Sequence, residues 1–115
     1  MQVYIINSPI TKERLKEIAK EGFLDLVKAV VDVKREIIAL GGELHADEEA
    51  VLLESGSRQE DLWGINLYPD KNELEFIEFD SVINLRPSQG NRSRGVDNLE
   101  IQNKIKEIIK KLIYD

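Results

Sequence analysis

Cysteine is absent from this sequence, which excludes disulfide bonds, thiolate metal sites and thiol nucleophiles. Histidine occurs once, at His45, and this excludes metal motifs built on two histidines. Long hydrophobic runs are missing too: no apolar stretch approaches the roughly 18 residues of a membrane span, and no basic residue precedes the apolar run near the N-terminus. We therefore expect a soluble cytoplasmic protein, and we predict no metal site.

The residues that are present have the composition of a folded domain. Hydrophobic residues make up 42% and charged residues 33%, which is ordinary for a globular protein and argues against disorder. The length of 115 residues is close to the commonest size of one compact domain. The sequence therefore predicts a single domain over residues 1–115.

The net charge of −6 is unevenly distributed along the chain. Residues 1–42 carry seven Lys/Arg and six Asp/Glu, residues 43–80 carry two and twelve, and residues 81–115 carry seven and four. A protein that coats nucleic acid needs a continuous basic surface to neutralise phosphates. The acidic middle of the chain argues against an extended nucleic-acid surface and leaves a local contact to a phosphate open.

Hydrophobic spacing predicts seven elements in the order β-α-α-β-β-β-α. A stripe that includes Phe23, Val30 and Leu40 predicts a core helix over 23–40, which Gly41 and Gly42 would end. Turn residues separate the three later strands, and a tight turn at 69–72 joins the last two. The predicted strands are 3–7, 50–55, 62–68 and 73–86, and the other two helices begin at Thr11 and Asp97.

This order predicts an α+β fold. The expected architecture is a two-layer sandwich, in which a mostly antiparallel sheet of about four strands carries the helices on one face. Asp97 and Glu100 have the spacing of a capping box at the start of the last helix. Its buried stripe is expected to be Ile101, Ile105, Ile108, Ile109 and Leu112.

Three motifs carry a resemblance to a known family: "GGELHADEEAVLLESGS", "QEDLWGINLYPD" and "INLRPSQGNRSRGV". Together they resemble a family of small uncharacterised bacterial and archaeal proteins, known only as a domain of unknown function. The resemblance covers nearly the whole chain. It implies a compact stand-alone domain and assigns no activity, cofactor, substrate or residue role.

The segment "RPSQGNRSRG", residues 86–95, is the first candidate site, and we name it the arginine loop. It is free of acids, is framed by glycines and leads into a helix N-terminus, so it suits an anionic or phosphate-bearing ligand or partner. In the alternative, its arginines pair with Glu78 or Asp80 and tie the loop down, or they form a protein interface. The ligand-binding candidates are Arg86, Gln89, Asn91, Arg92, Ser93 and Arg94.

The acidic segment 43–49 holds the second candidate, a small hydrolase-like site. His45 and Asp47 share one side of an extended chain and would act with an acid from the sheet face. The same two residues could instead bind a metal together with a distant carboxylate, such as Glu54 or Asp80. A single histidine is weak evidence for such a metal site. Alternatively, these acids are simply solvent-exposed residues of a connecting segment.

The polar face of the predicted sheet is the third candidate. It would suit a small ligand that carries both amine and anionic groups, although an ordinary solvated face explains the pattern equally well. Phe76 and Val82 share the parity of this face, so a homodimer joined through them or through the last helix is a further alternative. The expected members of the face are Glu54, Asn66, Tyr68, Asp80, Asn84 and Arg86.

Overall fold

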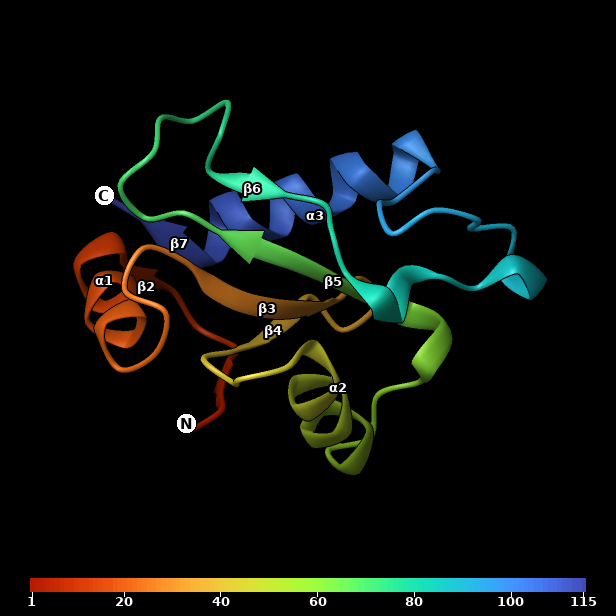
Figure 1. Ribbon diagram of the computed structural model, residues 1–115, viewed down its shortest axis with the longest axis horizontal. Helices are drawn as coiled ribbons and strands as arrows, with labels where there is room; N and C mark the ends of the chain where they lie inside the picture. The colour runs from red at the N-terminus through yellow and green to blue at the C-terminus, as the bar shows by residue number, and fades with distance from the viewer.

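The computed structural model describes residues 1–115 as an α+β fold around a five-stranded antiparallel sheet (Figure 1). The strand order is β1-β4-β3-β5-β6, so the long β3 and β5 lie at the centre. A separate parallel pair joins β2 to β7, near the two ends of the chain. The strands are β1 (Tyr4–Ile6), β2 (Ile10–Thr11), β3 (Val27–Asp32), β4 (Ile37–Leu40), β5 (Leu62–Leu67), β6 (Ile77–Glu78) and β7 (Ile113–Tyr114).

The helices cover both faces of the sheet. α1 (Lys12–Lys20) and α3 (Leu99–Leu112) pack into the main core with one face, whereas α2 (His45–Glu54) packs on the other through Leu52. Figure 1 shows α2 and α3 on opposite sides of β3 and β5. We expected helices on one face of a sheet of about four strands. The structure corrects this expectation, since the sheet has five strands and helices on both faces. None of the helices has the length and apolar character needed to cross a membrane.

The predicted core helix over 23–40 is wrong, because this segment forms the β3–β4 hairpin. Its turn is specified locally. The Asp32 carboxylate accepts hydrogen bonds from the backbone N–H groups of Lys34 and Arg35, both at 2.9 Å, and Glu36 takes a left-handed φ of 57°. Both faces of β3 are buried, so its apolar residues do not alternate with polar ones. A continuous β-branched run of this kind also satisfies a helical spacing, which explains the error.

The predicted strand over 50–55 is also wrong, because these residues complete α2. The helix begins within the acidic segment that was expected to be a connection. Asp47 starts it, since its carboxylate accepts a hydrogen bond from the backbone N–H of Leu44 at 3.1 Å. The apolar run at Val51–Leu53 is too short to distinguish a strand from one turn of helix.

The meander is correct in part. β5 confirms the strand predicted at 62–68, and β6 pairs with it in antiparallel fashion as expected. However, only residues 77–78 of the predicted strand 73–86 are β structure, and residues 82–84 form the 3₁₀ helix η2. The other two 3₁₀ helices are η1 (Gln59–Asp61) and η3 (Pro87–Gln89).

The two ends of the chain follow the sequence closely. Thr11 caps α1 by accepting a hydrogen bond from the Arg14 N–H, as predicted. The stripe of α3 is confirmed, with four of its five residues buried and Ile101 packed against the core. The N-cap of α3 is Asn98 rather than Asp97. The Asn98 side chain accepts hydrogen bonds from the backbone N–H groups of Glu100 and Ile101.

Candidate functional site

The arginine loop is organised around one buried side chain, Asn91, which is 3% exposed. Its amide nitrogen lies 2.8 Å from the carbonyl oxygen of Asn84, 3.1 Å from that of Ser93 and 2.9 Å from that of Gly95. Its amide oxygen accepts from the N–H of Asp97 at 2.8 Å. Asn91 is a predicted ligand-binding residue, and the structure uses every polar atom of its side chain inside the protein.

Two further predicted binding residues also form hydrogen bonds within the protein. The Arg86 guanidinium donates to the carbonyls of Gln59, at 2.6 Å, and Leu62, at 2.7 Å. It also lies 4.1 Å from the centroid of the Trp63 ring. Gln89 donates to a carbonyl of η1 at 2.8 Å. These contacts fasten the loop to the start of β5.

The remaining residues of the arginine loop lie closer to solvent. Arg94 forms an ion pair with Asp80 at 2.7 Å, which is one of the pairings weighed as the alternative to ligand binding. Ser93 donates to Asp97, and this bond, together with the Arg92 N–H, holds the pKa of Asp97 below its usual value. The exposed Arg92 side chain makes no hydrogen bond or ion pair. It is the one arginine of the loop that stays free.

The buried Asn84 ties η2 to the middle of β5. Its amide accepts from the N–H of Gly64 at 2.8 Å and donates to the carbonyl of the same residue at 2.9 Å. A β-carbon at Gly64 would lie 2.5 Å from the Ser81 β-carbon, which is closer than two carbons can approach. The backbone of β5 is therefore in contact with the Ser81 side chain, and a glycine is required at position 64.

Gly64→Ala should destabilise the protein by about 1–3 kcal/mol, because the added methyl forces Ser81 outward in a packed region. Urea unfolding measures the effect. In the double variant with Ser81→Gly, part of the loss should be recovered, because the clashing side chain is then gone. Strictly additive losses in this cycle would contradict the clash.

A row of polar side chains crosses the sheet on the face that carries α2. Lys28 of β3 lies opposite Asn66 of β5, and Asn66 lies opposite Glu78 of β6. The Asn66 amide donates to the Glu78 carboxylate at 2.9 Å, and the Tyr68 hydroxyl donates to the same oxygen at 3.0 Å. The Asn66 amide oxygen is buried without a partner. The row therefore presents an amide and a carboxylate that hydrogen-bond to each other, together with the Lys28 ammonium, which lies 5.0 Å from the centroid of the Phe23 ring.

His45, the first residue of α2, lies over this row. Its Nε2 is 2.8 Å from the Ile65 carbonyl oxygen, which can only accept, so Nε2 carries the proton and Nδ1 is the free acceptor. Burial lowers the pKa of His45, and the charge of Lys28 lowers it further, against the opposing effects of Ile65, Asn66 and Asp80. The imidazole is therefore neutral at neutral pH. We name Lys28, His45, Asn66, Glu78 and Asp80 the His45 cluster.

The structure separates His45 from its predicted partner. Asp47 is exposed, and its carboxylate caps α2 instead of approaching the imidazole. No three His, Cys, Asp or Glu side chains converge closely enough to hold a metal ion. Of the acids proposed from the sheet face, Asp80 belongs to the His45 cluster, while Glu54 is exposed at the end of α2.

The predicted sheet face is assembled in part. Asn66, Tyr68 and Asp80 gather as expected, since the Asn66 amide also donates to the carbonyl of Asp80 at 3.3 Å. Asn84 and Arg86 belong instead to the frame of the arginine loop. The two apolar residues of the same predicted parity also separate: Phe76 is 7% exposed and belongs to the main core, whereas Val82 is 62% exposed.

Sequence reasoning missed three members of this region, Lys28, Glu48 and Glu78, the last of which was expected only as a possible partner of the loop arginines. Glu48 lies one turn after His45 on α2, is 0% exposed, and neither of its carboxylate oxygens has a hydrogen-bond partner. Burial raises its pKa to about 10, although the charge of Lys28 opposes the shift. A lysine inside a run of valines was the available signal for Lys28. The position of Glu48 next to His45 becomes visible only if 45–54 is read as a helix.

Comparison with known proteins places this fold in a family. The family model described as a protein of unknown function, DUF5674, matches residues 4–112. The chain belongs to DUF5674. The match confirms the resemblance to a domain of unknown function and runs from the first residue of β1 to the last residue of α3. No curated protein and no solved structure gives a significant match. The His45 cluster and the arginine loop both lie within the DUF5674 match.

Proposed function

We propose that this protein is a small hydrolase-like enzyme that acts on a polar substrate by general acid–base catalysis at the His45 cluster. The observation that carries the proposal is the neutral imidazole, held through Nε2 by the Ile65 carbonyl, with Nδ1 as acceptor. A general base must be unprotonated at the working pH and held in a fixed orientation, and the His45 imidazole meets both conditions.

The neighbours of His45 supply the other parts of such a reaction. Nδ1 would take the proton of an attacking water, and the Lys28 ammonium would stabilise negative charge that develops on the substrate. Asn66 and Glu78 are held by mutual hydrogen bonds, so they can orient polar groups without first reorganising. Asp47, expected to act with His45, has no role in this scheme because it caps α2.

The test is a hydrolysis assay of the purified chain against p-nitrophenyl esters, phosphates and glycosides. His45→Gln should lower any activity found by about 10²–10⁴-fold, the usual contribution of a general base. Since the pKa of His45 is lowered, kcat/KM should rise with pH through a midpoint below 6.5 and stay level at neutral pH. The far-UV spectrum and the urea unfolding curve establish that the variant is folded.

Asp47→Asn is the matched control, because it changes a carboxylate two residues from His45 that lies outside the cluster. It should weaken the cap of α2 by about 0.5–2 kcal/mol and leave kcat/KM unchanged. A folded His45→Gln variant with full activity would contradict the proposal. A loss of activity that is equal in the two variants would assign the effect to α2 as a whole.

A second candidate function, the binding of an anion, rests on Arg92 and Arg94. Arg92 is free, and the hydrogen bonds of Asn91 hold the loop that presents it. Arg94 is 55% exposed and could exchange Asp80 for a ligand oxygen. The other four candidates of the arginine loop hold the loop in place, so the binding proposal is confined to these two guanidinium groups.

Inorganic phosphate and sulfate are the probes for this candidate. Either anion should raise the melting temperature if it prefers the folded protein, and the double variant Arg92→Ala/Arg94→Ala should lose this increase. Chloride at matched ionic strength is the control for screening. An equal increase in the double variant would remove the arginine loop from consideration.

A further inference from the structure

A groove of about 690 Å³ lies on the side of the sheet opposite the His45 cluster. The segment that joins β5 to β6 forms one wall, and the C-terminal half of α3 with β7 forms the other. In Figure 1 this segment arches outward on the side of the molecule where α3 and the C-terminus lie. We name it the α3 groove. Its volume lies within the range of sites that bind small molecules.

The floor of the α3 groove is apolar, because the helical stripe of α3 continues into it. Ile109 and Ile113 are 2% and 5% exposed, and Phe76 packs against them from the other wall at 7%. Leu74 is 93% exposed and Tyr114 is 51% exposed at the rim. An apolar chain lying on this floor would cover both rim residues and would remove apolar surface from water.

The rim of the groove carries positive charge that the protein leaves unpaired. Lys106 and Lys110 are one helical turn apart on α3, both are exposed, and neither forms an ion pair or a hydrogen bond. Lys12 is neutralised by Asp115 at 2.9 Å and lies 5.0 Å from the centroid of the Phe76 ring. Glu73 on the opposite wall is an exposed carboxylate that also lacks an ion pair, so the unpaired charges that line the groove are two ammonium groups and one carboxylate, with a net positive sign.

We propose that the α3 groove binds an anionic amphiphile, a molecule with one carboxylate or phosphate head group and a single apolar chain. The chain lies on Phe76, Ile109 and Ile113, and the head group lies between Lys106 and Lys110. Charge complementarity selects the head group, since a cation would meet the two ammonium groups. This site is independent of the His45 cluster, which lies on the other face of the sheet.

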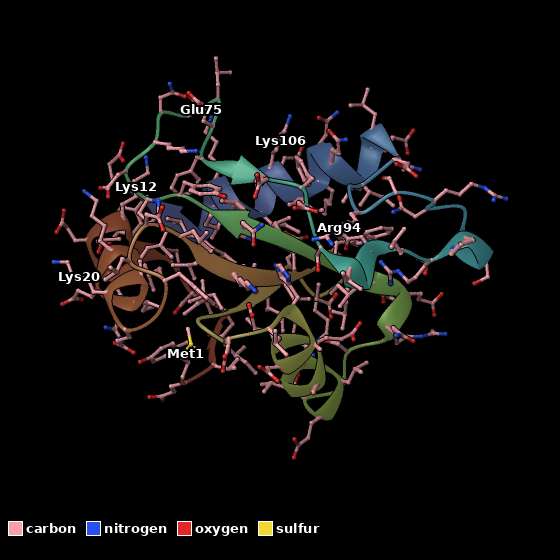
Figure 2. The ribbon with its side chains drawn as sticks, viewed as in Figure 1. Met1, Lys12, Lys20, Glu75, Arg94 and Lys106 are labelled. Atoms are coloured by element: carbon pink, nitrogen blue, oxygen red, sulfur yellow. The ribbon has the colours of Figure 1, made fainter.

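Decanoate, below the concentration at which it forms micelles, is the probe, and a ¹⁵N–¹H correlation spectrum follows the titration. The shifts should be confined to the walls of the α3 groove and should give a micromolar dissociation constant. The double variant Lys106→Gln/Lys110→Gln should weaken binding at least tenfold. Lys20→Gln is the control: Lys20 ends α1 and does not line the groove, it lies away from Lys106 in Figure 2, and binding should be unchanged.

Two other ligands separate the contributions of charge and chain. Acetate should not bind, because it lacks the chain, and decyltrimethylammonium should not bind, because its head group is repelled. Equal binding of decanoate and decyltrimethylammonium would overturn the proposal, as would an unchanged affinity in the lysine double variant. If resonances of the groove shift with protein concentration in the absence of ligand, a second copy of the chain occupies the α3 groove, and the proposal is overturned. Binding to phosphatidylglycerol vesicles without binding of decanoate would assign the lysines to a membrane surface instead.

Discussion

Glu48→Gln should make the protein more stable at alkaline pH, by roughly 4 kcal/mol more at about pH 8.5 than at about pH 5.5. In the unfolded chain this carboxyl ionises near 4.5, whereas in the folded protein burial raises its pKa to about 10. Between these values unfolding releases a proton, so each pH unit favours unfolding by up to about 1.4 kcal/mol. The contribution of Glu48 to the free energy of unfolding is therefore fully present below about pH 4.5 and is lost as the pH rises towards about 10.

Urea unfolding of both proteins at the two pH values measures this difference. Because the other titrating groups are common to both, the comparison isolates Glu48. Glu54→Gln is the control, since it removes a carboxylate from the exposed end of the same helix. It should change the free energy of unfolding by the same amount at both pH values. Parallel pH profiles of the wild type and Glu48→Gln would show that the Glu48 carboxyl is solvated in solution.

Asn91→Ala should destabilise the protein by about 3–5 kcal/mol, the second large effect. The substitution leaves the carbonyls of Asn84, Ser93 and Gly95 and the N–H of Asp97 without their partner. Buried polar groups that lose a hydrogen bond retain the full penalty of desolvation. Asn91→Asp keeps the shape but cannot donate, and its carboxylate would face the three carbonyl oxygens. It should be at least as destabilising as alanine.

Thermal and urea unfolding measure both Asn91 variants. Arg92→Ala is the matched control, because it removes a longer side chain from the next position without breaking any contact, and it should stay within about 0.5 kcal/mol of wild type. If Asn91→Ala were as mild as Arg92→Ala, the other contacts of the arginine loop, such as those of Arg86, Gln89 and Arg94, would be enough to hold it.

The sequence predicts α1, β5 and α3 correctly, because each has a signal that does not depend on the rest of the fold. Thr11 caps α1, and four isoleucines and a leucine leave a polar opposite side on α3. The β3–β4 hairpin lacks such a signal. Its residues are buried on both faces, and only the turn made by Asp32 and Glu36 distinguishes it from a helix. That turn depends on a left-handed φ at a glutamate, which no sequence rule anticipates.

The sequence predicts those residues of the candidate site that lie on correctly predicted secondary structure, and it misses the others. Asn66, Tyr68 and Asp80 are grouped correctly, because β5 is a strand and the segment after it returns alongside. Lys28 joins them only when 27–32 is a strand paired with β5, so the erroneous helix hid it. The arginine loop illustrates the opposite limit. Its composition suits the binding of an anion. However, the same side-chain types also donate hydrogen bonds to backbone carbonyls of the protein, as Asn91 and Arg86 do.

The parallel pair β2–β7 has a consequence for how the protein is made. It joins Ile10 to Ile113 and Thr11 to Tyr114, and Thr11 is also the residue that caps α1. During translation Ile10 and Thr11 emerge before β3, β5 and α3, and their parallel bridge cannot form until residues 113–114 have been synthesised. The residues of the β3–β4 hairpin and of α2 are all synthesised before then. The contact between these two distant parts of the sequence is therefore available only after residues 113–114 have been synthesised.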